Sequence, residues 1–425
     1  MRWLLLVGVW GLYASFGLVA SCLAPLVSLV EHELAISHSA MGSVLGAWQL
    51  VYMFAAIPCG LLLDRLGTRW SLALGVLLIA LSGFARSLAT DFSTLLLSVM
   101  AFGLGAPIIS TGSPKVVTEW FEGPSRGLAM GIYATGPAIG GALSLTLTHS
   151  WLLPWLGDWR ELMRFWAALG ALSGLVWIGV TALPSFHEAE ARRRGAGSLP
   201  QLSTMRSLAD QSDVRLLLAM ATGTFMIAHG VGSWLPALLQ SRGMAEIEAG
   251  YWSAIPTLVG IVSALVVPRL AIPTRRRRLL FLLVATSGIS TLFLQWAARP
   301  SLLAGLVLQG AAATVLTPIL VLTLLELPGV GEKRAGTASG LFFSAAQIGG
   351  VVGPFGVGVL LDLSGGFALG LAMLGLTAVA VLSGVDRLSR AETTPTAATG
   401  PAASAPTAAR PDGAMAPAEI RPDVG

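Results

Sequence analysis

The sequence has few charged side chains and almost no cysteine. Charged residues make up 11% of the 425 positions, hydrophobic residues make up 54%, and only 2 cysteines are present. This composition lies outside the range of soluble globular domains. Two cysteines inside apolar runs form no disulfide framework, and the 5 histidines include no H-x-x-x-H pair. Because nucleotide-binding and nucleophile motifs are missing as well, we expect no metal, no cofactor and no enzymatic activity.

Long apolar runs are what the sequence does contain. About twenty apolar residues in a helix cross the roughly 30 Å of a bilayer's hydrocarbon core. Backbone polar groups in lipid must be satisfied within the spanning segment, which favours helices. The twelve runs are 3–29, 41–62, 70–88, 93–117, 127–149, 160–182, 214–239, 250–268, 279–297, 301–324, 336–361 and 367–385. The sequence therefore predicts an all-α membrane protein with twelve transmembrane helices.

Positive charges are unequally divided between the predicted loops. Lys and Arg in short loops stay on the cytoplasmic side, and an inside N-terminus places 21 of the 26 there. We therefore expect a multi-pass protein of the inner membrane with both termini in the cytoplasm. The net charge of +4 follows from the same asymmetry, so no nucleic-acid partner is expected. The expected partners of this monomer are the lipid bilayer, a small solute and, as a candidate coupling ion, the proton.

A polar stretch divides the twelve runs into six and six. Residues 184–213 contain all of the charged residues between the sixth and seventh runs. They predict a cytoplasmic linker between an N-terminal six-helix bundle, 1–183, and a C-terminal six-helix bundle, 214–390. Residues 391–425 are rich in Ala, Pro and Thr, a composition that predicts a disordered cytoplasmic tail.

Small residues recur in the fifth and eleventh runs, at related positions of the two halves. Glycines four residues apart lie on one helix face and allow close helix approach, and proline permits bending. The fifth run contains Gly136, Pro137, Gly140 and Gly141, and the eleventh contains Gly349, Gly353 and Pro354. Both runs also begin with such glycines, at Gly127 and Gly131 and at Gly336 and Gly340. We expect these two helices to form a moving seam between the halves, with static close packing as the alternative.

The loop between the second and third runs, "GLLLDRLGTRW" over residues 60–70, combines charges with glycines. Its spacing, G-x-x-x-D-R-x-G-x-R, resembles the signature loop of the major facilitator superfamily and falls at that family's position. The resemblance implies two six-helix bundles that rock about a midplane site, with Asp64 as a latch. A carboxylate is favoured near a helix N-terminus by about 0.3–1 kcal/mol, and the eleventh helix begins on the same side. The predicted gating loop comprises Gly60, Asp64, Arg65, Gly67 and Arg69, with Arg126 and Arg334 beside it.

A longer stretch narrows this resemblance. Residues 126–167 are similar to the cyanate permease and 2-nitroimidazole transporter group. The segment "GPAIGG", residues 136–141, also resembles an element of proton-coupled drug antiporters, although Ile132 stands where that pattern has glycine. A proton-coupled efflux antiporter for drugs or metabolites is therefore an alternative.

No Asp or Glu lies near the middle of any predicted helix. Because a cavity without carboxylates is a poor host for cations, the sequence favours a small anion or a neutral solute. The polar side chains predicted at mid-membrane depth are Tyr13, Gln49, Tyr52, Tyr133, His229, Gln309 and Gln347. Each is either a substrate contact or an interhelical hydrogen bond, and only His229 changes charge near neutral pH. We predict a secondary active transporter, with a non-transporting sensor or assembly partner as the alternative of another class.

Overall fold

The computed structural model describes residues 2–182, 202–270, 273–327 and 330–393, and over these ranges it contains helices and no strand. Of the predicted linker, 184–213, only residues 202–213 are described. Of the predicted tail, 391–425, only residues 391–393 are described, so the disorder expected there concerns residues outside the described ranges.

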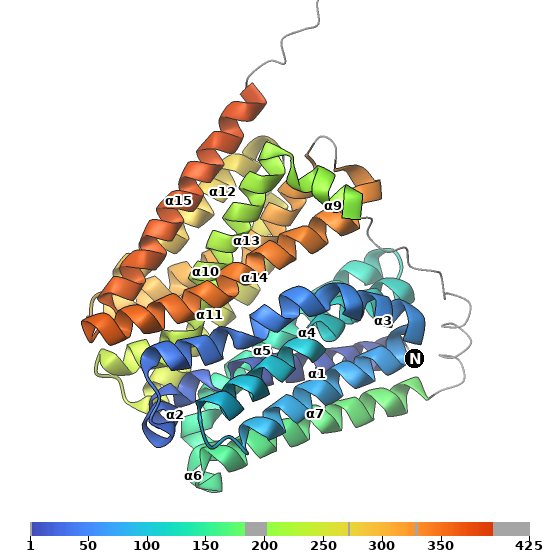
Figure 1. Cartoon of the computed structure of the whole chain (residues 1–425). Helices are drawn as coiled ribbons and strands as arrows, with labels where there is room; N and C mark the ends of the chain where they lie inside the picture. Colours follow the sequence, from blue (N-terminus) through green and yellow to red (C-terminus); the bar gives the residue numbers. More distant parts are fainter. Residues whose placement is uncertain (1, 183–201, 271–272, 328–329, 394–425) are drawn as a thin grey trace, which may run out of the picture.

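The N-terminal half consists of five long helices and the short ones that extend them (Figure 1). The long helices are α1 (Arg2–Ser21), α3 (His38–Arg86), α4 (Phe92–Trp120), α5 (Pro124–Leu147) and α7 (Trp159–Thr181). The 3-10 turn η1 (Ala24–Leu26) and α2 (Val27–Leu34) extend α1, and the π-helical turn η2 (Thr148–Leu152) and α6 (Leu153–Leu156) extend α5. With 49 residues, α3 is about 74 Å long, more than twice the thickness of a bilayer core. It bends at Gly67, whose φ of 80° favours glycine, and therefore crosses twice.

The C-terminal half contains six long helices. A short helix, α9 (Leu202–Ala209), precedes α10 (Ser212–Ser241), α11 (Glu246–Val266), the 3-10 turn η3 (Val267–Leu270), α12 (Pro273–Phe293), α13 (Arg299–Leu325), α14 (Gly331–Ser364) and α15 (Ala368–Thr393). In the part of the chain that is described, 10 helices are long and apolar enough to cross a membrane. The second crossing of α3 makes eleven. The twelfth is α12, which packs between α13 and α15 although it begins with four arginines, Arg275 to Arg278.

Twelve crossings confirm the predicted all-α membrane fold. An even number of crossings places the start of α1 and the end of α15 on the same face. We call this the N-terminal face; it holds Arg2, Gly67 and the end of α15. The other, which we call the opposite face, holds the loops such as the one between α3 and α4. There Asp91 begins α4 by accepting a hydrogen bond from the Thr94 backbone N–H at 2.9 Å. This bond lowers the pKa of the Asp91 carboxyl.

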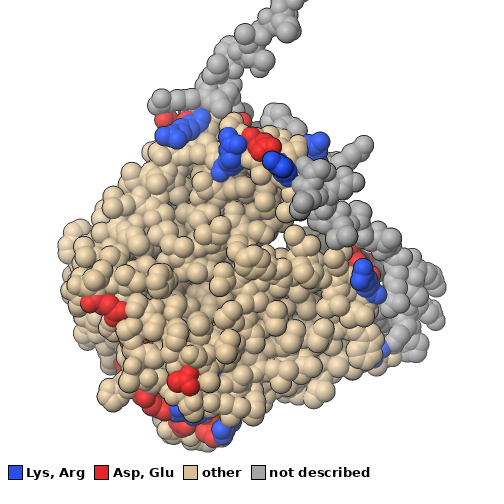
Figure 2. Space-filling view, viewed as in Figure 1, with Lys and Arg blue, Asp and Glu red and all other residues tan. Residues whose placement is uncertain are grey.

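The two halves touch on the opposite face and diverge toward the N-terminal face (Figure 1). On the opposite face α3 meets α14 so closely that a Cβ on Gly42 would collide with the Pro354 carbonyl, and one on Gly358 with that of His38. Toward the N-terminal face, a Cβ would meet nothing within 4 Å on Gly60, Gly127, Gly131, Gly336 or Gly340. Figure 2 shows an opening between the halves beside the residues drawn in grey. The described conformation is therefore closed on the opposite face only.

The two helices expected at the seam do contact the other half, α5 against α11 and α14 against α3. The glycines expected there instead join helices within each half. A Cβ on Gly140 of α5 would collide with the Ala14 carbonyl of α1, and one on Gly349 of α14 with the Thr222 carbonyl of α10. Gly136 and Gly141 also face α1, and Gly353 also faces α10. The spacing correctly indicated close approach, but the partner helix belongs to the same half because α5 presents this face to α1. Pro354 alone of this set also faces the other half, at Gly42.

The close contact between α5 and α1 can be tested with one pair of alanine variants. In Gly140→Ala the new methyl group meets the Ala14 carbonyl, whereas in Gly131→Ala it enters open space. We expect Gly140→Ala to cost about 1–3 kcal/mol of stability, as overpacking does in well-packed interiors. Thermal unfolding of the purified protein in detergent measures this cost. Equal unfolding temperatures for the two variants would show that α5 and α1 are not in close contact.

Candidate functional site

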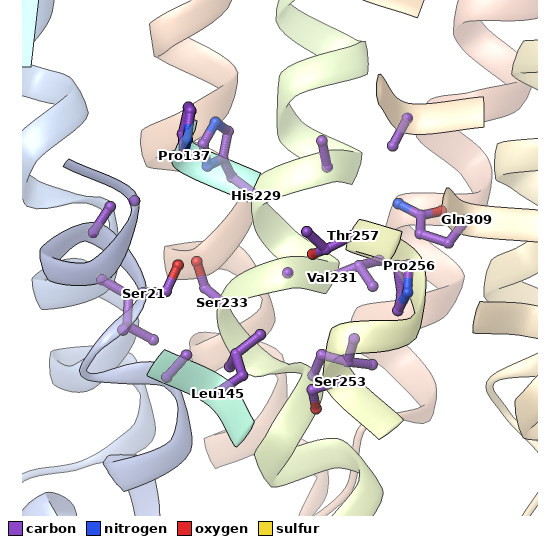
Figure 3. Close-up of a pocket in the computed structure, with 18 of the residues that line it drawn as sticks. Ser21, Pro137, Leu145, His229, Val231, Ser233, Ser253, Pro256, Thr257 and Gln309 are labelled. Atoms are coloured by element: carbon purple, nitrogen blue, oxygen red, sulfur yellow. The ribbon is translucent and has the colours of Figure 1, made fainter. Parts of the chain in front are cut away.

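A cavity of about 370 Å³ lies between the two halves (Figure 3). Helices α1, α3 and α5 line it from the N-terminal half, and α10, α11 and α13 line it from the C-terminal half. None of the described residues that line it is Asp, Glu, Lys, Arg, Tyr or Cys. Apart from one imidazole, the cavity thus consists of neutral side chains and backbone. The cavity lies at the boundary between the two halves. A solute could reach such a position from either face.

Two polar side chains meet across the cavity from different halves. Gln49 of α3 and His229 of α10 lie 3.2 Å apart, measured from the amide Nε2 to the imidazole Nδ1. The ring of Trp48 packs edge-on to His229, with ring centroids 6.0 Å apart, and the ring of Phe225 lies 5.5 Å from it. Gln49 is 1% exposed, and its amide oxygen has no hydrogen-bond partner among the described residues. An amide acceptor is therefore left for something else to satisfy.

A second amide reaches the cavity from α13. The Oε1 atom of Gln309 accepts hydrogen bonds from Ser290 at 2.6 Å and from Ser287 at 3.4 Å, both on α12. These bonds fix the orientation of the amide and leave its nitrogen for the cavity. Figure 3 shows Gln309 on the same wall as Thr257 and Pro256, with Ser21 and Ser233 on the far side. The cavity therefore carries donors and acceptors on more than one wall.

The remaining polar candidates lie outside the lining. Tyr13 stacks on Tyr133 with ring centroids 5.8 Å apart, and Tyr52 shares a 2.9 Å hydrogen bond with Ser110. Gln347 of α14 is 4% exposed and lies close to Gly350. Of the seven residues predicted at mid-membrane depth, the structure brings Gln49, His229 and Gln309 to the cavity and places the other four in helix packing. A direct role of those four in binding stays a prediction.

Several lining residues were not singled out from the sequence. They are small hydroxyl and aromatic side chains: Phe16, Ser21, Trp48, Ser233, Ser253, Thr257 and Thr314. Hydroxyl groups are common in apolar helices because they bond to backbone carbonyls one turn earlier, as Ser253 does with Ala249 at 2.7 Å. Their presence in a helix therefore gives no signal of a cavity, and only the packing identifies them.

The predicted gating loop lies on the N-terminal face. Asp64 pairs with Lys115 of α4 at 2.7 Å, within the same half, and Gly67 provides the bend in α3. The guanidinium of Arg69 lies 5.0 Å from the ring centroid of Trp70, and Arg65 is exposed. Arg126 and Arg334 are exposed near the starts of α5 and α14. Lys115 was not expected as a partner, and contact between Asp64 and α14 remains a prediction for another conformation.

A second acid occupies a related position on the opposite face. The carboxylate of Asp362, near the end of α14, accepts hydrogen bonds from the backbone N–H groups of His38 at 3.0 Å and Ser39 at 2.7 Å. These groups lie at the start of α3, in the other half. Gly358 and Asp362 repeat the G-x-x-x-D spacing of Gly60 and Asp64. That repeat was not recognised from the sequence, although it is the one sequence signal that could have indicated the contact.

Further polar contacts on the opposite face join the two halves. The Nδ1 atom of His149, in η2, lies 3.2 Å from a carboxylate oxygen of Glu246, at the start of α11. The Nε2 atom of the same ring lies 2.8 Å from the Pro25 carbonyl. Ser28 donates to Gln240 at 3.4 Å. Together with Asp362, these contacts close the opposite face.

Arg86 is a buried cation that does not reach the cavity. It is 1% exposed, donates to the Val19 carbonyl at 2.7 Å and to the Cys22 sulfur at 3.1 Å, and lies over the ring of Phe102. Its charge therefore lies within the N-terminal half rather than on the cavity wall.

Comparisons with known proteins agree with this geometry. The sequence pattern of the Major Facilitator Superfamily matches residues 9–354. The chain belongs to this superfamily. It is 25% identical to the D-galactonate transporter of Escherichia coli O6:H1 (strain CFT073), over 84% of this chain and 88% of that protein. It is 26% identical to the cyanate transport protein of Escherichia coli (strain K12), over 84% of this chain and 90% of that protein.

A solved structure shows the same fold. The nucleoside transporter NupG superposes with a TM-score of 0.75 at 13% identity, covering 90% of this chain and 99% of that one. Family, relatives and fold make this member of the superfamily a multi-pass membrane protein and a secondary transporter of small solutes.

Proposed function

We propose that this superfamily member moves a small anion or neutral solute by alternating access, with the cavity at Gln49 and His229 as its binding site. The supporting observation is the hydrogen bond between these residues, because it joins the two halves at the cavity itself. A solute bound here touches both moving bodies and can therefore shift their equilibrium. The moving bodies we propose are residues 1–183 and 214–390, joined by the linker 184–213. We infer no enzymatic step and no cofactor.

We propose that the N-terminal face is cytoplasmic. This face carries the clustered bases of the gating loop and of α12, as cytoplasmic loops do in membrane proteins. Figure 2 shows blue side chains along the upper edge, where α12 begins and α15 ends. The described conformation then opens to the cytoplasm, and we place the protein as a monomer in the inner membrane. A non-transporting sensor of the same fold fits less well, because the relatives that the chain matches over most of their length are transport proteins.

Proton coupling, and with it the efflux-antiporter alternative, would depend on His229. It is the only residue among the described lining with a titratable side chain. Drug antiport by this cavity would have to proceed without a carboxylate to hold a cation or a proton.

We propose that two acids act as latches on opposite faces. Asp362 of α14, by its contact with the start of α3, stabilises the described state. Asp64 of α3, by contact with the start of α14, would stabilise the state open to the opposite face. Both use the attraction between a carboxylate and a helix N-terminus. The exchange of one latch for the other then accompanies each transport half-cycle.

The two latches predict opposite effects of two neutral substitutions. Asp362→Asn should raise the population open to the opposite face by about two- to fivefold, and Asp64→Asn should lower it by a similar factor. Reaction of Thr257→Cys in the cavity, with Cys22 and Cys59 replaced by Ala, measures this population when an impermeant thiol reagent is added to whole cells.

Asp210→Asn, on the exposed turn after α9, is the matched control and should leave the reaction rate unchanged. If Asp362→Asn also leaves the rate unchanged, the contact with α3 is not a latch.

A transport assay tests the proposed function and the role of His229 together. Proteoliposomes should exchange a labelled small solute. D-galactonate and cyanate are the first probes, because the names of two relatives include these solutes. We expect transport to vary with pH, because His229 is the only described residue of the cavity wall with a side chain that can take up a proton. In His229→Gln transport should fall and its pH dependence should flatten, because the amide cannot take up a proton.

The assay is run at fixed membrane potential, with empty liposomes as the blank. An unchanged pH profile in His229→Gln would show that coupling resides elsewhere. Absence of exchange for every solute in a panel that includes uncharged heterocycles would contradict transport.

A further inference from the structure

His149 is a buried imidazole on the opposite face, and both of its ring nitrogens face acceptors. The Nε2 atom lies 2.8 Å from the Pro25 carbonyl oxygen, and the Nδ1 atom lies 3.2 Å from a carboxylate oxygen of Glu246. A neutral imidazole has one N–H and one lone pair, so it satisfies only one of these oxygens. The Glu246 side chain is 66% exposed, and an exposed carboxyl group is ionised near neutral pH. Both contacts are therefore satisfied when His149 is an imidazolium with a hydrogen on each nitrogen.

The elements around His149 hold this geometry and bring no competing charge. The ring projects from the π-helical turn η2, a local distortion that is frequent at functional sites. Helices α5, α6 and α11 pack against this turn. The titratable side chains of these three helices are Arg126 and Tyr133 on α5 and Glu246, Glu248 and Tyr251 on α11. Those of α5 lie about four turns or more away along the helix, and Glu248 pairs with Arg299 at 3.0 Å. Glu246 is thus the one charged partner of the ring among the described residues.

The two acceptors belong to different halves. Pro25 in η1 and His149 in η2 lie in the N-terminal half, whereas Glu246 begins α11 of the C-terminal half. When the halves separate on the opposite face, the contact with Pro25 stays and keeps a hydrogen on Nε2. Glu246 then leaves, and Nδ1 meets water. Because an ordinary imidazole in water is mostly neutral above about pH 6.5, the closed state holds one proton more than the open state near neutral pH.

We propose that Nδ1 of His149 is a proton-binding site that regulates the gate on the opposite face. Closure brings Glu246 to the ring, and the lone pair of Nδ1 takes a proton from the water on that side. Opening returns the proton to the same water, so none crosses the membrane. Because the closed state binds the additional proton, acidity favours closure and rising pH favours opening. With the orientation proposed above, the pH outside the cell sets this balance, whatever the cargo is.

Nitrogen NMR of the full-length protein with isotope-labelled histidine measures the protonation of His149 directly. The halves are held closed by a short bifunctional thiol reagent that joins Ser28→Cys to Gln240→Cys, with Cys22 and Cys59 replaced by Ala. The side chains of Ser28 and Gln240 lie 3.4 Å apart across the halves. The signals of His149 are those absent from the His149→Gln spectrum. We expect both nitrogens to carry hydrogen at about pH 8, where an exposed imidazole such as that of His32 is neutral. A neutral ring in the linked protein at that pH would overturn the proposal.

A change of the partner from acid to amide separates its charge from its shape. In Glu246→Gln the amide nitrogen donates to Nδ1, so a neutral ring satisfies both contacts. We therefore expect His149 to be neutral at about pH 8 in this linked variant. Glu248→Gln, the same substitution two residues along α11, is the matched control and should leave the imidazolium in place. Identical spectra for Glu246→Gln and the linked parent protein would overturn the proposal.

The effect on the gate is measured by electron spin resonance without the thiol reagent and without cargo. Labels at Leu88 and Leu369, both exposed on the opposite face, report the distance between the halves. We expect the ratio of long to short distances to rise about fivefold or more between about pH 6 and 8. In Glu246→Gln this rise should be lost, and His229 is present in both proteins, so its own titration contributes equally.

A rise of the same size in both proteins, or no rise in either, would overturn the regulation of the gate by His149. Neither result would contradict transport itself, because exchange in proteoliposomes does not require this site.

Discussion

The close approach of α3 and α14 on the opposite face holds the described conformation together, and the other features of the molecule follow from it. Glycines on both helices let one backbone reach the other, at Gly42 against Pro354 and at Gly358 against His38. The Asp362 carboxylate then satisfies backbone N–H groups at the start of α3 that a helix cannot bond internally. Contact at one face requires separation at the other, because the six-helix groups are stiff. The cavity lies where the two groups begin to diverge.

The near absence of charge at the cavity follows from the same arrangement. Charged residues on the cavity wall would need partners in both conformations, and a pair formed across the halves in one state would be broken in the other. The chain instead places its charged contacts at the membrane faces, where water can replace a lost partner. Examples are Asp64 with Lys115 on the N-terminal face and His149 with Glu246 on the opposite face. The cavity is left with amides, hydroxyls and one imidazole. These groups select a cargo by the directions of their hydrogen bonds and by the shape of the cavity.

The sequence predicts the fold well and the site only in part. Twelve spans follow from apolar length, and the superfamily from the loop at Gly60 to Arg69. Gln49, His229 and Gln309, which line the cavity, were selected because polar groups are rare at that depth. The same rule also selected Tyr13 and Tyr52, which pack between helices. Glycine spacing indicates close approach without naming the partner helix, so Gly140 and Gly349 were placed at the wrong surface. Asp362 resembled an ordinary loop charge because its partner lies in the other half.

Paired distance measurements by electron spin resonance test alternating access most directly. With Cys22 and Cys59 replaced, spin labels at the exposed positions Leu88 and Leu363 report on the opposite face, and labels at Glu122 and Ser207 report on the N-terminal face. The account predicts a short first distance and a long second distance in the absence of cargo. It also predicts that transported cargo produces a second population, in which the distance on the opposite face is longer and the distance on the N-terminal face is shorter. A single, unchanging distance on the opposite face in protein that transports would contradict it.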